Sequence, residues 1–193
     1  MFETIKFKPQ GHLRVWDKDT GNILLEQHND INPENFSYAI AASLTGLKDG
    51  GGNPYGNIRY MAFGNGGARV TSSNKFIYSV PQTIGRAASL YNETFRKDIL
   101  TSDDKEGTYM NVTHAVGNEY SDIVVRCTLK RDEALGVLGS VEENGSIITE
   151  QTFSEIGLVT SGGDMITHLC FFPLLKSQNS ELIFDYILRI QIV

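Results

Sequence analysis

Histidine and cysteine are the residue types of this chain best suited to metal binding or nucleophilic chemistry. The chain has six of them: His12, His28, His114, His168, Cys127 and Cys170. They show no recognised metal-ligand spacing among themselves, although His168 could meet His114 or His28 in space. A single histidine on a strand more often faces solvent or makes one structural hydrogen bond. Each cysteine lies in an apolar run typical of a strand. We therefore expect buried thiols, no disulfide, no metal and no cofactor.

Glu155 is the carboxylate most suited to acid–base chemistry, because its neighbours Phe153 and Ile156 are apolar. Such surroundings can raise a carboxyl pKa and produce a general acid. Pairing with a lysine or arginine at the edge of a strand is the favoured interpretation. A glycosidase assembled from Glu93, Glu119 and Glu155 is the enzymatic alternative. The chain contains no Gly-x-Ser-x-Gly motif, and we expect that it is not an enzyme.

Two loops resemble ligand-binding motifs only in part. The segment 17–28 begins like a calcium loop at Asp17 and Asp19, but His28 stands where the bidentate glutamate is required. A hairpin turn is the favoured interpretation. The segment 64–69 places glycines directly after a strand, as a dinucleotide fold does, but Arg69 occupies the third glycine position. We interpret this segment as a tight turn whose glycines need positive φ.

The last strand is the clearest element that could position such residues. From Leu182 to Ile192 every even position is apolar, whereas the odd positions include Glu181, Asp185 and Arg189. This period of two predicts a strand with one buried face. Two lone strands are marginal in water, so the strand must belong to a larger sheet.

One helix is predicted over residues 33–45. Asn32 can cap its first amides, and Pro33 fits the first helical position. Phe36, Ile40 and Leu44 are spaced by four and form one apolar stripe. We expect the helix to stop near Gly46 and to be followed by a glycine-rich, mobile loop over residues 48–56.

Other short apolar runs, separated by polar turns, predict the rest of a sheet. We expect strands near residues 13–16, 23–26, 57–63, 76–80, 93–100, 123–129, 147–156 and 165–171, with a turn of helix within 83–91 and a loop over 134–144. This spacing predicts a mostly β fold, an antiparallel β-sandwich or jelly roll with one short α-helix near residues 33–45. The predicted organisation is an N-terminal arm over residues 1–10 and a single β-sandwich domain over residues 11–193.

Composition narrows the range of partners. The net charge of −6 argues against a protein that binds a phosphate backbone, so we expect no nucleic-acid partner. No run approaches the roughly twenty apolar residues of a membrane span, and no membrane partner is expected. The first sixteen residues show no apolar signal-peptide stretch, which predicts synthesis in the cytoplasm.

Several segments, taken in order, resemble a class of tailed-bacteriophage virion proteins. They are GHLRVWDKDTGNILLEQHNDINPENFSYAIAASLTG, IRYMAFGNGGARV, SLYNETF and FSEIGLVTSGGDMITHLCFFPLLKSQNSELIFDYILRI. The resemblance implies a β-sandwich, the lack of an enzymatic site, and many copies on one particle. It implies location in the virion, with other virion proteins and copies of the same chain as partners. The resemblance leaves the position on the virion open: the neck or collar, the tail or baseplate, or the outside of the head as a decoration protein.

A subunit of this kind needs surfaces that contact its neighbours. The arm is the favoured element, since its apolar residues Phe2, Ile5 and Phe7 could add a strand to an adjacent sheet. The alternative is that the arm folds back as an edge strand of its own domain. Tyr55 and Arg69, beside the glycine-rich loops, are the other candidates. A receptor-binding or carbohydrate-binding tail module is a further alternative, in which Tyr55, Tyr60 and Tyr78 would stack on sugars.

Overall fold

The computed structural model describes residues 6–100, 105–135 and 150–192. It is mostly β with one helix, which confirms the predicted fold class. The strands are β1 (Phe7–Asp17), β2 (Ile23–Ile31), β3 (Ile58–Gly64), β4 (Ala68–Val70), β5 (Phe76–Tyr78), β6 (Glu93–Asp98), β7 (Tyr109–Thr113), β8 (Tyr120–Leu129), β9 (Glu150–Thr160), β10 (Thr167–Ser177) and β11 (Leu182–Ile192); the helix is α1 (Pro33–Thr45).

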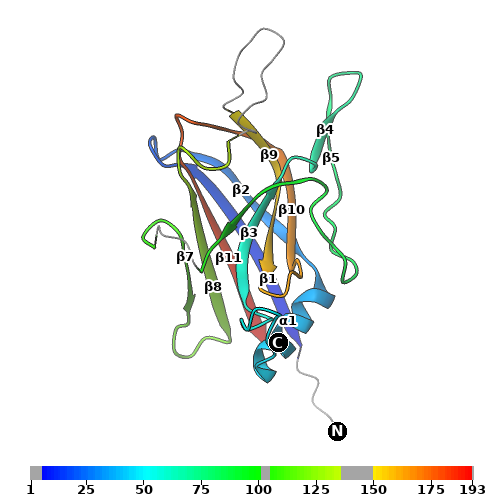
Figure 1. Ribbon diagram of the computed structural model, residues 1–193, viewed down its shortest axis with the longest axis vertical. Helices are drawn as coiled ribbons and strands as arrows, with labels where there is room; N and C mark the ends of the chain where they lie inside the picture. Colours follow the sequence, from blue (N-terminus) through cyan, green and yellow to red (C-terminus); the bar gives the residue numbers. More distant parts are fainter. Residues whose placement is uncertain (1–5, 101–104, 136–149, 193) are drawn as a thin grey trace.

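Nine of these strands form one antiparallel sheet in the order β6-β3-β9-β10-β2-β1-β11-β8-β7, and β4 and β5 form a separate hairpin. The large sheet folds over itself where β10 meets β2, because these strands pair only at Thr167↔Ile31 and His168↔Asp30. The two halves then pack face to face: the ring centroids of Phe63 on β3 and Phe184 on β11 lie 4.9 Å apart. The result is a sandwich made from one continuous sheet (Figure 1).

The closing strand β11 lies inside this sheet, as its alternation predicts. It pairs with β1 on one side and β8 on the other. Its even residues Leu182, Phe184, Tyr186 and Leu188 are buried in the core. The odd residues lie on the opposite face, where Asp185 accepts two hydrogen bonds from Arg126 of β8. The strand therefore buries its apolar residues on one face and pairs a charged residue on the other.

The helix forms where the sequence predicts it. Asn32 accepts a hydrogen bond from the amide of Asn35, Pro33 lies in the first turn, and Gly46 ends the helix at φ 66°. Phe36 and Ala39 bury one face against the core. The loop after the helix is held by Asp49, whose Oδ1 accepts hydrogen bonds from the amides of Gly51 and Asn53.

Other predicted elements differ from the structure in specific ways. Residues 7–10 belong to β1 and pair with β11, so the predicted arm boundary at residue 10 falls inside a strand. Residues 83–91 contain no helix, and β4 and β7 were not predicted. Residues 136–144 of the predicted loop lie outside the described residues. The segment 17–22 is a hairpin turn, in which Asp17 accepts from the amide of Thr20.

Candidate functional site

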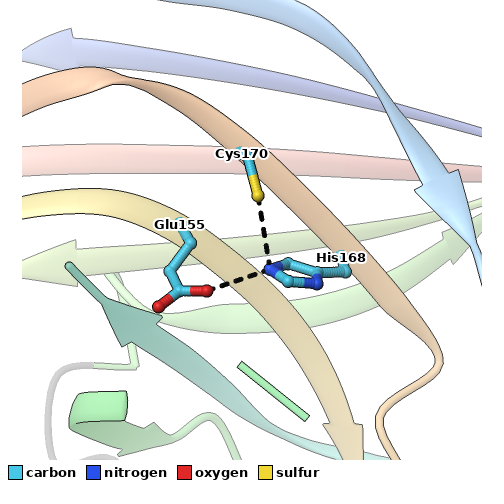
Figure 2. A group of neighbouring side chains, drawn as sticks. All are labelled: Glu155, His168 and Cys170. Carbon is cyan, nitrogen blue, oxygen red and sulfur yellow. Dashed lines mark hydrogen bonds and ion pairs between the residues drawn. The ribbon is translucent and has the colours of Figure 1, made fainter. Parts of the chain in front are cut away.

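Three potential ligand side chains, from Glu155, His168 and Cys170, converge on the face of β9 and β10 that the segment 65–92 covers (Figure 2). Glu155 lies on β9, and the other two lie on β10. A turn after β9 reverses the chain, and the resulting register places Cys170 opposite Glu155. Glu155 Oε2 lies 3.1 Å from His168 Nε2, and Cys170 Sγ lies 3.6 Å from the same nitrogen. Glu155 and His168 are completely buried, so this is the strongest site candidate among the described residues.

The carboxylate of Glu155 is saturated by hydrogen bonds. Its Oε1 accepts from the amides of Gly66 and Asn92, both at 2.8 Å. Its Oε2 accepts from the amide of Tyr91 at 2.8 Å and faces His168. Burial alone raises the pKa of Glu155, but these donors outweigh burial and hold the pKa below its usual value. Glu155 is therefore a buried, ionised acceptor, and both interpretations made from the sequence, a raised-pKa acid and an arginine or lysine pair, are wrong.

The glycines of the segment 64–67 allow this close approach of backbone to carboxylate. A Cβ atom at Gly66 would lie 2.9 Å from Glu155 Oε1, and one at Gly67 would lie 2.1 Å from the carbonyl oxygen of Ser154. Neither glycine has a positive φ. The prediction of a turn that needs positive φ is wrong, because lack of a side chain is what the packing requires here.

The tautomer of His168 is fixed by Gln82, whose backbone amide donates to Nδ1 at 2.7 Å. A backbone amide can only donate, so Nδ1 carries no proton and Nε2–H donates to Glu155. A metal at Nε2 would require a neutral ring with its proton on Nδ1, facing the Gln82 N–H. Burial also raises the pKa of the Cys170 thiol to about 12, which opposes formation of a thiolate ligand. These residues do not fit a metal ion.

The arrangement instead joins distant parts of the chain. We call this group of hydrogen-bonded residues the Glu155 clasp. It consists of Glu155, His168 and the backbone amides of Gly66, Gln82, Tyr91 and Asn92. The segment 65–92 leaves the sandwich after β3, forms the β4–β5 hairpin and returns at β6. The clasp binds this segment at its start, its middle and its end. Its chemistry is that of a structural anchor.

The other groups that could do chemistry have separate partners. Glu93 pairs with Arg96, and Glu119 is exposed, so neither shares the buried environment of Glu155. The rings of His12 and His28 contact each other at 5.4 Å. His114 instead hydrogen-bonds to Tyr120 and Ser121. Both cysteines are free and buried, as predicted.

The tyrosines proposed for sugar stacking also have different surroundings. Tyr55 packs its ring over Gly162, where a Cβ would lie 2.2 Å from the ring. Tyr60 lies beside the guanidinium groups of Arg59 and Arg96. Tyr78 is half exposed on the β4–β5 hairpin. Of the interface candidates, Phe7 and Arg69 are exposed, Tyr55 is partly buried, and Phe2 and Ile5 lie outside the described residues.

Two exposed apolar surfaces were not predicted. The hairpin surface consists of Val70, Phe76 and Tyr78 from β4 and β5, with Phe172 of β10. The α1 groove is a cavity of about 380 Å³ between α1 and the strands β7, β8 and β11, and Ile40, Leu44, Met110, Val112 and Ile190 are among its lining residues. Figure 1 shows the hairpin and α1 at opposite ends of the longest axis of the molecule.

Comparisons with known proteins place the chain in no established group. No protein-family model matches it. Searches of curated proteins and of solved structures also gave no match. In the part of the chain that the structure describes, no helix is both long enough and apolar enough to cross a membrane.

Proposed function

We propose that this chain is a structural component of a tailed-bacteriophage virion, in the neck or collar or in the tail or baseplate. It acts by packing against neighbouring subunits and performs no catalysis. The virion setting rests on the sequence resemblance described above. The structural observation that carries the proposal is the pair of exposed apolar surfaces at opposite ends of the molecule, the hairpin surface and the α1 groove.

The exposure of these side chains is large for residues of their type. Leu44 and Val112 of the groove are 84% and 67% exposed, and Val70 and Tyr78 of the hairpin are 55% and 51% exposed. Exposed apolar patches of this kind on soluble proteins often mark interaction sites. The lining residues of the groove include no charged side chain. The cores of protein interfaces are likewise depleted in charged residues.

The Glu155 clasp supports a structural role in a second way. The hairpin extends away from the sandwich, and a two-stranded hairpin alone is marginally stable in water. The clasp fixes the backbone on both sides of the hairpin to β9 and β10. An anchored surface loses less conformational freedom on binding, which favours association. Each oxygen of Glu155 already has two donors, which supports the non-catalytic part of the proposal.

Particle analysis tests this function directly. Virions of the phage that carries this gene would be purified by density gradient and examined by quantitative mass spectrometry and immunogold labelling. We expect the chain in stoichiometric amounts, with label at the neck, tail or baseplate. A non-structural protein of the same phage, absent from the particles, is the control. Infectious particles that lack the chain would refute the proposal, and label confined to the head surface would favour a decoration protein.

A further inference from the structure

We propose that the hairpin surface of one copy docks in the α1 groove of a second copy, so that copies of this chain associate head to tail. This inference names a second copy of the chain as the binding partner. Its setting in the virion rests on the proposed structural function. The two surfaces lie at opposite ends of the molecule (Figure 1). Neither is covered by another described element, and both are apolar.

The hairpin presents Val70, Phe76 and Tyr78 on one face, while Ile77 lies on the other face opposite Arg69. Val70 pairs with Phe76 and Ala68 pairs with Tyr78, and residues opposite each other on paired strands share a face. The ring of Phe76 packs at 4.8 Å against that of Phe172 on β10, which joins the hairpin to the sandwich. Phe76 and Phe172 nevertheless remain 45% and 52% exposed. The surface is therefore built into the fold and only half covered by it.

The exposed apolar area of the hairpin surface is about half of what a stable interface buries on each partner. Taking about 200 Å² for each large side chain, the four half-exposed residues of the hairpin surface offer about 400 Å². A stable interface buries about 800 Å² on each partner. The hairpin surface therefore supplies the apolar centre of an interface, and polar residues around it supply the rim. The groove of about 380 Å³ lies in the size range of pockets that receive apolar groups.

Charge favours this arrangement over a two-fold pairing of hairpins. The hairpin, residues 68–78, contains Arg69 and Lys75 and no aspartate or glutamate, so it carries +2. The net charge of the chain is −6, which leaves −8 for the remaining residues. A two-fold contact between hairpins would bring like charges together, whereas a head-to-tail contact places a cationic hairpin against an anionic body. Contacts between two different surfaces produce rings or open filaments.

Single substitutions at each surface test the contact. The full-length chain would be examined by analytical ultracentrifugation over a range of concentrations. We expect association of the wild type, and a dissociation constant raised about tenfold or more by Phe76→Asp or Leu44→Asp. Val112→Asp and Tyr78→Asp serve as second variants at each surface, should one fail to fold. Ile23→Asp is the matched control, because Ile23 is 54% exposed and lies outside both surfaces.

Mixing the variants tests the head-to-tail geometry. Phe76→Asp keeps an intact groove, and Leu44→Asp keeps an intact hairpin surface. An equimolar mixture should therefore form a heterodimer that cannot grow further, while each variant alone stays monomeric. Dimerisation of either variant alone with the dissociation constant of the wild type would overturn the inference. So would a wild type that is monomeric at every concentration or that associates only with another virion protein. Presence of the chain in purified particles would leave the proposed function standing in each of these cases.

Discussion

The backbone amide of Gln82 donates a hydrogen bond of 2.7 Å to Nδ1 of His168. This bond decides which nitrogen of the ring carries the proton, and it thereby directs Nε2–H towards Glu155. The carboxylate accepts three further amide bonds. A continuous series of hydrogen bonds thus runs from the loop at Gln82 through the imidazole to the returning segment at Tyr91. The stability of the clasp depends on an ionised Glu155.

Replacing Glu155 with glutamine should destabilise the fold by about 2–6 kcal/mol, because two buried donors would lose their acceptor at about 1–3 kcal/mol each. Each carboxylate oxygen accepts two hydrogen bonds. The glutamine NH₂ group would face two donors whichever way the amide is turned. Urea unfolding followed by circular dichroism measures the change in the free energy of unfolding.

The matched control is Glu119→Gln, because Glu119 is exposed between β7 and β8. We expect this change to stay within about 0.5 kcal/mol of the wild type. Equal stability of the two variants would show that the clasp does not stabilise the fold.

Acid should weaken the wild type more than the Glu155→Gln variant. The folded-state pKa of Glu155 lies below its ordinary value of 4.5, so the unfolded state binds more protons in this range. The contribution of Glu155 to stability is complete above about pH 4.5 and is lost as the pH falls through the folded-state pKa. The difference in unfolding free energy between the two proteins should therefore narrow below pH 4.5. If the difference in unfolding free energy between the two proteins stays constant from pH 6 to about pH 3, Glu155 is not an ionised carboxylate with a lowered pKa.

Zinc should not stabilise the protein through the buried cluster. Zinc at one hundred times the dissociation constant of a specific site would add about 2.7 kcal/mol. We expect no such gain from Glu155, His168 and Cys170, because the Gln82 amide opposes the tautomer that a metal requires. Thermal unfolding with zinc and with EDTA provides the measurement. A stabilisation by zinc that disappears in Cys170→Ser would contradict the tautomer argument.

Local sequence signals sufficed for the elements whose partners lie nearby. The helix was predicted from its own caps, Asn32 and Gly46, and the structure confirms both. The alternation after Leu182 correctly predicted a strand with one buried face. The turn near residues 161–164 also contained unused information. Counting outward from the middle of this turn places position 170 opposite 155, as in the structure. The register beside the turn would not have given this pair, because Val159 pairs with Met165 there and the pairing shifts by one residue before Ile156.

The remaining features depend on contacts between distant residues. The backbone amide donors to Glu155 lie 63 to 89 residues away, and no local pattern predicts them. The exposure of Phe76 and Tyr78 could not be predicted either. Their alternation resembles that of a core strand, and only the position of the hairpin outside the sandwich leaves them exposed. Strand β7 was missed because it is short and its residues lack a clear period of two.

Replacing Gly67 with alanine should destabilise the protein by about 1–3 kcal/mol, the usual cost of overpacking. Its Cβ would lie 2.1 Å from the carbonyl oxygen of Ser154 and 2.8 Å from the Cβ of Glu155. The first contact is with backbone, so relief requires a shift of β9 or of the clasp. Gly50→Ala is the control, because a Cβ there meets no atom within 4 Å and the φ of Gly50 is not positive. Thermal unfolding of both variants gives the comparison, and a Gly67→Ala protein as stable as Gly50→Ala would show that the segment 64–67 does not need its glycines for packing.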